Sequence, residues 1–403
     1  MTTKSKVPQI RFKGFSEEWE SDTVGTFYNF KNGLNKGKEF FGYGTPIVNF
    51  TDVFHNRSII SNNLKGKVSL SSDEISNYNV KEGDIFFTRT SETINEIGYP
   101  AVMTDSPINT VFSGFVLRAR AIDLDPLALS FKQYVFFTDI FRSEMVKKSS
   151  MTTRALTSGT AIKQMLFTFP KDKNEQIKIG DYFQQLDKLI EQKENKYQKL
   201  KQFKKAMLDK MFPKNGADTP EIRFKGFIGK WEEKEINELF IVTRGDVLAA
   251  TETSSQKSEK MPYPVYSSQT KNNGLLGFYK KYLFENAITW TTDGANAGTV
   301  KYREGKFYST NVNGVLLSND GYANLAIAEI LNNIAWKHVS YVGNPKLMNN
   351  VMSKIKIIIP NTIEEQIQIS KYIKQLDKQI DLQQKELEKL KNIKKASLAK
   401  MFV

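Results

Sequence analysis

The chain has 403 residues, no cysteine, two histidines and a formal net charge of +14. The lack of cysteine excludes disulfides, cysteine-ligated zinc and a catalytic thiol, and two histidines disfavour a histidine-built metal site or a Ser-His-Asp triad. The length suits two domains better than one core.

The positive charge favours a polyanionic partner, because lysines and arginines that neutralise phosphates release counterions. On charge alone, a basic protein without a nucleic-acid partner remains the alternative. The excess is spread evenly, with +3 over residues 1–169, +4 over 170–212, +4 over 213–359 and +3 over 360–403. A DNA contact would therefore come from folded surfaces in both halves. Neither a signal peptide nor a membrane-spanning stretch is recognisable, so a cytoplasmic protein is expected.

The opening motif Ile10–Phe15 (IRFKGF) returns at Ile222–Phe227, and a Trp-Glu pair follows each copy at an offset of 212. The register continues into the first predicted element of each half, at Phe27–Gly33 and Leu239–Gly245. Such a repeat indicates an internal duplication.

Each half continues with a mixed α/β body. Short β-type runs alternate with turn residues, as in 83–92 and 287–300. The pattern predicts one helix in each body, at Leu127–Lys148 and Tyr322–Lys337, and a last strand at 165–170 and 355–360.

Each body is followed by a repeated segment. About half the positions of residues 170–212 are identical 190 residues later. A heptad row predicts a long helix in each copy. The rows are Ile179, Phe183, Leu186, Ile190, Lys193, Tyr197, Leu200, Lys204, Met207, Met211 and Ile369, Ile373, Leu376, Ile380, Gln383, Leu387, Leu390, Lys394, Ser397, Met401. We expect the two helices to pair as an antiparallel coiled coil; the alternative is that each packs on its own body.

The predicted fold class is therefore α/β (α+β), with two mixed bodies separated by two long helices in a pseudo-twofold repeat. The predicted boundaries are 1–169 and 214–359 for the bodies, and 170–213 and 360–403 for the helical repeats.

No catalytic motif is recognisable in the chain. A Gly-Lys-Thr phosphate loop, a two-glycine nucleotide fingerprint and an HExxH helix are absent from the sequence. Gly343–Leu347 (GNPKL) contains Asn-Pro but lacks the aromatic residue with which an adenine methyltransferase stacks a flipped base. We expect no catalytic residue, metal or cofactor in this chain.

The turns are rich in side chains that hydrogen-bond to bases and phosphates. For any one of them a solvated loop is the alternative, so the groups are more informative than their members. The candidates for DNA binding are Arg89, Thr90, Ser91, Thr152, Thr153 and Arg154 in the first body, and Ser268, Gln269, Lys271, Asn272, Thr292, Asn296 and Asn349 in the second.

Two variable bodies alternating with two repeated helices, each half opening on IRFKGF and Trp, make the chain similar to the specificity subunits of bacterial Type I restriction-modification systems. The "EQI" and "QLDK" of each helix start and the "KMF" of each helix end carry the same resemblance, which covers essentially the whole chain.

The resemblance implies that each body is a target recognition domain that reads half of a bipartite, asymmetric DNA sequence. It implies that the helices dock two modification subunits, which bind S-adenosylmethionine and methylate adenine N6. It also implies restriction subunits that use ATP and magnesium. The repeated motif would then be structural or would face the partner.

Leu189, Phe203 and Ile393 lie outside the heptad rows and suggest a further helical partner. The alternative function is a two-headed coiled-coil adaptor for protein ligands.

Overall fold

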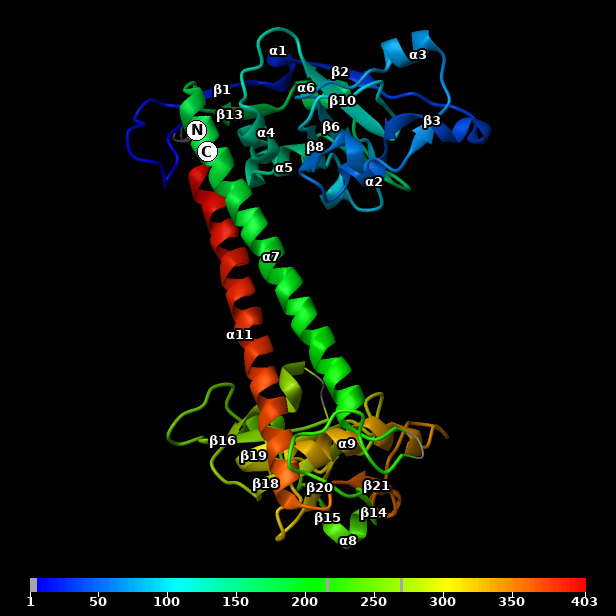
Figure 1. The fold of residues 1–403 in the computed structure, drawn as a ribbon. Helices are drawn as coiled ribbons and strands as arrows, with labels where there is room; N and C mark the ends of the chain where they lie inside the picture. Colours follow the sequence, from blue (N-terminus) through cyan, green and yellow to red (C-terminus); the bar gives the residue numbers. More distant parts are fainter. Residues whose placement is uncertain (1–5, 215–216, 269–270) are drawn as a thin grey trace. The chain divides into compact units, whose positions relative to one another are not determined.

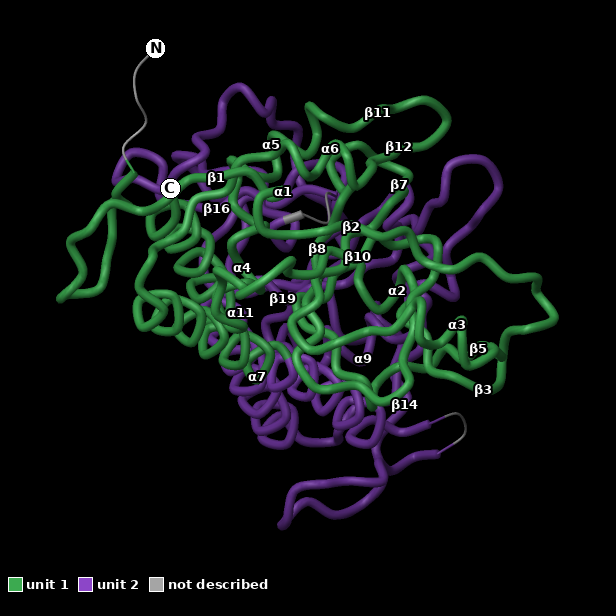
Figure 2. The backbone as a smooth tube through the Cα atoms, turned by 90° about the horizontal axis from the view of Figure 1, so that it is seen from above, with its two compact units in different colours: residues 1–194, 386–403 green, residues 195–385 purple. Residues whose placement is uncertain are grey.

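The chain forms two compact units in a computed structural model that describes residues 6–214, 217–268 and 271–403. Unit 1 comprises Met1–Glu194 and Glu386–Val403, and unit 2 comprises Asn195–Lys385 (Figure 2). Each unit combines β-sheets with helices, which confirms the predicted fold class (Figure 1). The predicted boundaries of the bodies and helical repeats stay a prediction, because this division cuts both long helices. No described helix is long and apolar enough to span a membrane.

Unit 1 is built on a five-stranded sheet in the order β2-β10-β6-β8-β4. Its central strands are antiparallel, and β4 is parallel to β8. Smaller sheets have the orders β5-β3-β9, β11-β12-β7 and β1-β13. The strands are β1 (Glu20–Thr23), β2 (Tyr28–Asn32), β3 (Phe41–Val48), β4 (Ser58–Ile59), β5 (Lys67–Val68), β6 (Ile85–Thr88), β7 (Thr90–Ser91), β8 (Pro100–Met103), β9 (Val111–Phe112), β10 (Val116–Ala121), β11 (Ser150–Met151), β12 (Ala155–Leu156) and β13 (Leu166–Phe169).

The helices of unit 1 that precede its long helix are short. They are α1 (Val24–Phe27), α2 (Phe50–Val53), α3 (Ser72–Asn77), α4 (Leu129–Val135), α5 (Asp139–Lys147) and α6 (Gly159–Lys163). The prediction of one helix over Leu127–Lys148 is wrong, because α4 ends at Val135 and a second helix, α5, begins at Asp139. The hydroxyl of Thr138 accepts a hydrogen bond from the backbone N–H of Phe141 and caps α5. A threonine that caps a new helix start favours two helices over one.

Unit 2 is built on a six-stranded sheet in the order β15-β20-β18-β19-β16-β17. Its strands are antiparallel except that β16 is parallel to β19, and β14 pairs separately with β21. The strands are β14 (Glu232–Glu235), β15 (Ile241–Arg244), β16 (Tyr263–Tyr266), β17 (Leu275–Tyr279), β18 (Phe284–Thr291), β19 (Val300–Ser309), β20 (Asn313–Leu317) and β21 (Lys356–Ile359). The helices are α8 (Ile236–Leu239), α9 (Leu325–Ala335) and α10 (Asn349–Met352). Helix α9 confirms the helix predicted at Tyr322–Lys337, though it is shorter.

The two long helices, α7 (Lys173–Met211) and α11 (Ile363–Met401), have 39 residues each. Within each unit they run antiparallel. In unit 1 the first half of α7 lies beside the last part of α11, where the hydroxyls of Tyr182 and Ser397 are 3.1 Å apart. In unit 2 the last part of α7 lies beside the first half of α11, where Lys204 Nζ is 2.6 Å from Asp377 Oδ1.

Every position of the two predicted heptad rows is buried or half-buried. The rows include polar residues that the apolar pattern disfavoured, and two of them show how the seam accepts them. Lys394 forms an ion pair with Asp187, and Ser397 meets Tyr182. Contacts of this kind let a helix seam accept lysine and serine without leaving a buried charge or hydroxyl unsatisfied.

The motif IRFKGF is bound to the start of a long helix in each unit. In unit 1 the guanidinium of Arg11 donates to both carboxylate oxygens of Glu175, and Phe12 packs edge-on against Tyr182. Gly14 has φ +97°, a backbone conformation that favours glycine. The motif therefore has a structural role, as expected.

The second copy makes the same contacts in unit 2. Arg223 donates to both oxygens of Glu365, Phe224 packs edge-on against Tyr372, and Gly226 also has φ +97°. The residues that follow the motif are repeated for packing reasons too. The ring centres of Trp19 and Phe402 are 6.1 Å apart, and those of Trp231 and Phe212 are 6.4 Å apart. Each unit thus holds its variable part on the same internal frame.

Candidate nucleic-acid interface

The segments predicted to bind DNA in unit 1 lie side by side. Strand β12 pairs with β7, with Ala155 opposite Ser91 and Leu156 opposite Thr90. Strand β11 pairs with β12 and completes a hairpin whose tip is 152–154 (Figure 2). Residues about 60 positions apart in sequence therefore form one small sheet. The structure brings together the two groups of candidates that the sequence left separate.

The hairpin tip carries the most accessible of these side chains. Thr152, Thr153 and Arg154 are exposed, and the backbone N–H of Thr152 donates to the carbonyl of Arg154 at 3.2 Å. The guanidinium of Arg154 lies 3.1 Å from the carboxylate of Glu92, and both side chains are more than half exposed. An exposed pair of this kind is weak, so a phosphate or a guanine can replace Glu92 as the partner of Arg154 at small cost.

The candidates at the base of the hairpin are more enclosed. Ser91 is buried, and its hydroxyl accepts a hydrogen bond from the backbone N–H of Thr93. Arg89 and Thr90 are half-buried, and the backbone of Arg89 bonds to Phe115 and Thr157. These three residues position the hairpin, and contact with bases by them stays a prediction.

Unit 2 has a hairpin at the corresponding place. The backbones of Ser340 and Lys346 exchange two hydrogen bonds, of 2.8 and 2.9 Å. This hairpin is attached to the end of β18, where Asp293 bridges to Lys346 and the carbonyl of Thr292 accepts from Leu347. In both units a two-stranded projection thus lies between two body helices, α5 and α6 in unit 1 and α9 and α10 in unit 2, and rests on the segment after a central strand.

The tip of this second hairpin is apolar and was missed in the sequence. Tyr341 is 69 % exposed, Val342 is 93 % exposed, and Gly343 turns the chain at φ +76°. The nearby Lys346 is also exposed. A short Tyr-Val pair has no periodicity, so the only signal was the turn sequence Gly-Asn-Pro that follows it. Exposed apolar side chains beside lysine suit a DNA groove, where they contact thymine methyl groups or base faces.

The other candidates of unit 2 are distributed around this hairpin. The hydroxyl of Thr292 donates to the carbonyl of Val312, and the amide of Asn349 donates to that of Thr243. Asn296 is half-buried in the turn between β18 and β19. Thr292 and Asn349 are thereby tied to neighbouring segments of unit 2, and contact of the three residues with DNA stays a prediction.

A separate loop carries the remaining candidates. Ser268 is half-buried, and Asn272 is exposed with φ +49°, in the left-handed region. Gln269 lies outside the described residues, as does the side chain of Lys271. The described hydrogen bonds connect this loop to Arg303, whose guanidinium donates to the carbonyl of Asn273 at 2.8 Å. The structure therefore does not join this loop to the hairpin.

Arg303 is a buried residue that the sequence analysis did not single out. Its guanidinium lies 3.8 Å from the ring centre of Tyr266 and donates to the hydroxyl of Thr289. Burial lowers the pKa of Arg303 to about 10, so the group is still charged at neutral pH. Its contacts fix the loop after β16 against the main sheet of unit 2.

The three helix residues predicted to bind a partner are accessible. Leu189 and Ile393 are each 38 % exposed, and Phe203 is 47 % exposed. Phe203 and Ile393 are equivalent, because they are 190 positions apart. The same repeated position therefore carries an exposed apolar side chain in both units.

The described residues contain no group of three or more His, Cys, Asp or Glu side chains that could hold a metal ion. What the two hairpins offer is hydrogen-bonding, cationic and apolar contact.

Residues 228–392 match the family described as the Type I restriction modification DNA specificity domain. A putative type I specificity subunit N-terminus of Mycoplasma pneumoniae is 39 % identical over 126 residues, which is 30 % of this chain and 66 % of that protein. The Type I restriction enzyme MpnII specificity subunit of the same organism is 33 % identical over 133 residues, which is 32 % of this chain and 39 % of that protein. The matches therefore span less than two thirds of these relatives.

Solved structures share the fold over nearly the whole chain. The crystal structure of a Type-I restriction-modification system S subunit from M. genitalium has a TM-score of 0.68 at 17 % identity, covering 98 % of this chain and 99 % of that one. A chain from a structural study of type I R-M complex assembly has a TM-score of 0.52 at 14 % identity, covering 95 % and 97 %.

Proposed function

Because the chain belongs to the Type I restriction-modification specificity family, we propose that it reads a bipartite, asymmetric DNA sequence with one half-site for each unit. The observation that carries this proposal is the pair of corresponding hairpins. The two hairpins belong to units that share the same repeated Arg-Glu and Trp-Phe contacts. Their tips differ completely, with Thr-Thr-Arg in one and Tyr-Val-Gly in the other. A constant frame with divergent tips is what two different half-sites require.

The first hairpin reads by hydrogen bonds in this proposal. Arg154 donates to guanine O6 and N7 or to a phosphate, and Thr152 and Thr153 donate or accept at base edges. The second hairpin reads by shape, with Tyr341 and Val342 against base faces or methyl groups and Lys346 on the backbone. The net charge of +14, spread over both halves, supplies the salt-dependent part of the affinity.

The paired helices dock two modification subunits in this proposal, through the exposed Leu189, Phe203 and Ile393. Those subunits bind S-adenosylmethionine and methylate adenine N6, and restriction subunits with ATP and magnesium complete the enzyme. The chain itself contributes recognition and geometry rather than catalysis. Linking two recognition units in one chain raises affinity, because binding of the first half-site raises the effective concentration of the second unit.

The test is a methylation map, by single-molecule sequencing, of DNA from cells that express this chain with its modification subunit. The expected result is one asymmetric, two-part motif with adenine methylation on both strands. Exchange of one unit's hairpin should change one half of the motif only. Failure to find any motif, with both proteins present and co-purifying, would contradict the proposal.

Salt dependence separates this function from the adaptor alternative. For a DNA-binding protein, the logarithm of the association constant falls linearly with the logarithm of the salt concentration, with a slope of about −0.9 for each phosphate that the protein neutralises. A protein adaptor should show no DNA affinity that salt removes. DNA binding measured at several salt concentrations therefore distinguishes the two.

A further inference from the structure

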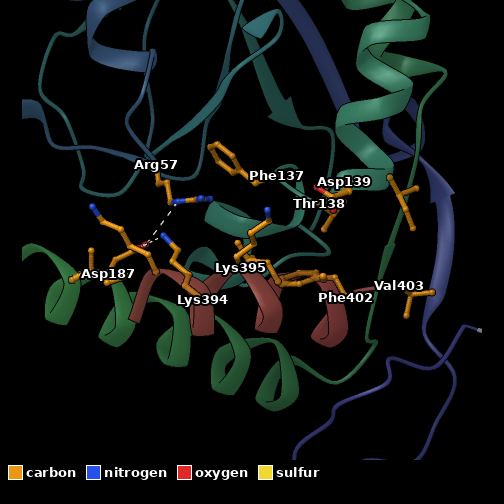
Figure 3. Close-up of a pocket in the computed structure, with 14 residues that line it drawn as sticks. Arg57, Phe137, Thr138, Asp139, Asp187, Lys394, Lys395, Phe402 and Val403 are labelled. Carbon is orange, nitrogen blue, oxygen red and sulfur yellow. Dashed lines mark hydrogen bonds and ion pairs between the residues drawn. The ribbon is translucent and has the colours of Figure 1, made fainter. Parts of the chain in front are cut away.

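Unit 1 contains a groove of about 450 Å³ beside the end of α11 (Figure 3). Its body side is formed by Arg57 and by the residues around the start of α5, and α7 contributes Asp187 and Ile190. The other side of the groove comes from α11, through Lys391, Lys394, Lys395 and Leu398, and from Phe402 just after its end.

Unit 2 contains a groove at the equivalent place, of about 1170 Å³. Its body side comes from the end of α9, through Asn333, Ile334 and Lys337, and α11 contributes Asp377 and Ile380. The helical lining repeats the residue types of unit 1 at an offset of 190, with Lys201, Lys204, Lys205, Leu208 and Phe212. Each residue of 201–213 is also buried, half-buried or exposed like its equivalent in 391–403.

The two grooves therefore share their helical side and differ on their body side. Arg57 and Phe137 in one groove are replaced by Asn333 and Ile334 in the other. Packing on the body alone does not explain the repetition of Lys395 and Lys205, because both side chains are exposed. A surface that stays constant while its surroundings diverge fits an occupant that is the same in both units.

Each groove has an apolar floor and, along its helical side, a rim of lysines. The floor is leucine, phenylalanine and isoleucine in both grooves. Of the lysines, Lys394 is paired with Asp187, and Lys204 is paired with Asp377. Lys395 and Lys205 are exposed and form no ion pair with any described residue. An occupant that presents an apolar side chain next to a carboxylate satisfies both features.

The grooves are distinct from the apolar helix face of Phe203 and Ile393. Phe203 is two residues from both Lys201 and Lys205, which is about 200° around a helix of 3.6 residues per turn. Ile393 is related in the same way to Lys391 and Lys395. The helix pair thus has two repeated surfaces within each unit, one apolar and one mixed.

We propose that each groove receives the same acidic, amphipathic segment of the modification subunit, one segment for each unit. This inference rests on the proposed function, because it takes the modification subunit as the partner. DNA is the less suitable occupant, since phosphate contacts use exposed lysines and need no enclosed apolar floor.

The test reverses the charge of the two exposed lysines, with Lys205→Glu and Lys395→Glu, singly and together. Native mass spectrometry of the full chain co-purified with the modification subunit reports how many copies are bound. The expected result is two copies for the unaltered chain, one for each single variant and none for the double variant, with affinity lowered at least about tenfold per groove. The matched control is Lys188→Glu with Lys378→Glu, since these lysines are exposed, lie on the same helices and are also 190 positions apart.

Three outcomes overturn the inference. The first is that the double variant still binds two copies of the modification subunit at unchanged affinity. The second is that the control pair causes the same loss of bound subunit. The third is that the variants lose DNA affinity in the absence of the modification subunit while binding of that subunit is unchanged. Should a glutamate variant misfold by circular dichroism, Lys205→Gln with Lys395→Gln replaces it, with a smaller loss expected. Failure of the unaltered chain to bind the modification subunit would instead contradict the proposed function, so the two failures are distinguishable.

Discussion

The guanidinium of Arg11 holds the carboxylate of Glu175 in two hydrogen bonds, of 2.6 and 2.8 Å, although 164 positions separate the two residues. Glu175 lies in the first turn of α7 and its side chain is 1 % exposed. The hydrogen bond with Glu175 raises the pKa of Arg11, against the opposing effect of burial. Arg223 and Glu365 form the same pair in unit 2, with distances of 2.7 and 2.8 Å.

This relationship predicts a large cost for removing one partner. Arg11→Met leaves a buried carboxylate without its cation, which should cost about 3–5 kcal/mol. Hydrogen exchange of the amides in the first two turns of α7 should rise accordingly. The double variant Arg11→Met, Glu175→Met should lose less, because no uncompensated charge remains. Lys13→Met, an exposed residue of the same motif, is the control, and equal exchange in the single and control variants would contradict the prediction.

A substitution at the tip of the first hairpin should weaken DNA recognition without lowering the stability of the fold. Arg154→Ala removes an exposed guanidinium whose only described ion pair is with the exposed Glu92, so the fold should be unchanged within about 0.5 kcal/mol. If Arg154 reads a guanine, discrimination at one position should fall by about 1–3 kcal/mol, or about 10- to 100-fold. Competition binding with single-base variants of the mapped motif measures this loss. Uniform weakening at all positions would instead assign Arg154 to a phosphate, and Lys147→Ala serves as an exposed control.

The second hairpin predicts an affinity contribution from apolar side chains. Tyr341→Ser with Val342→Ser should lower specific DNA affinity by about tenfold or more, because stacking and groove contacts of this kind contribute about 1–3 kcal/mol. Thermal stability should stay the same, since both side chains are exposed. Val247→Ser changes another exposed valine of unit 2 and should leave affinity unaltered. A hairpin variant that binds DNA as well as this control would show that the hairpin does not enter the groove.

Charged substitutions at the repeated apolar helix positions should weaken binding of the modification subunit. Phe203→Glu with Ile393→Glu should reduce capture of the modification subunit at least about tenfold before it unfolds the chain, because both side chains are largely outside the seam. Ile228→Glu alters a more exposed isoleucine of unit 2 away from the helices and is the control. Unchanged capture by the folded double variant would remove these positions from the docking surface.

The heptad rows predicted the long helices well, because their periodicity spans ten positions and survives a few polar residues. The break between α4 and α5 was not predicted, since the apolar content of 127–148 is continuous and only the cap at Thr138 interrupts it. For the site, the sequence identified Thr152–Arg154 and Arg89–Ser91 as candidates by residue type. Their pairing depends on a strand register between distant segments, which no local pattern contains.

By itself, the sequence determined the duplication, the two helices and the constant borders of each half, because repeats and heptads are local or self-comparing signals. Only the tertiary structure decided that IRFKGF binds a buried glutamate and that a Tyr-Val tip projects where unit 1 has Thr-Thr-Arg. It also decided that grooves with the same helical lining lie beside α11 and α7. The physical reason is that burial, ion pairing and exposure depend on which distant segments meet, and those contacts are settled by packing of the whole unit.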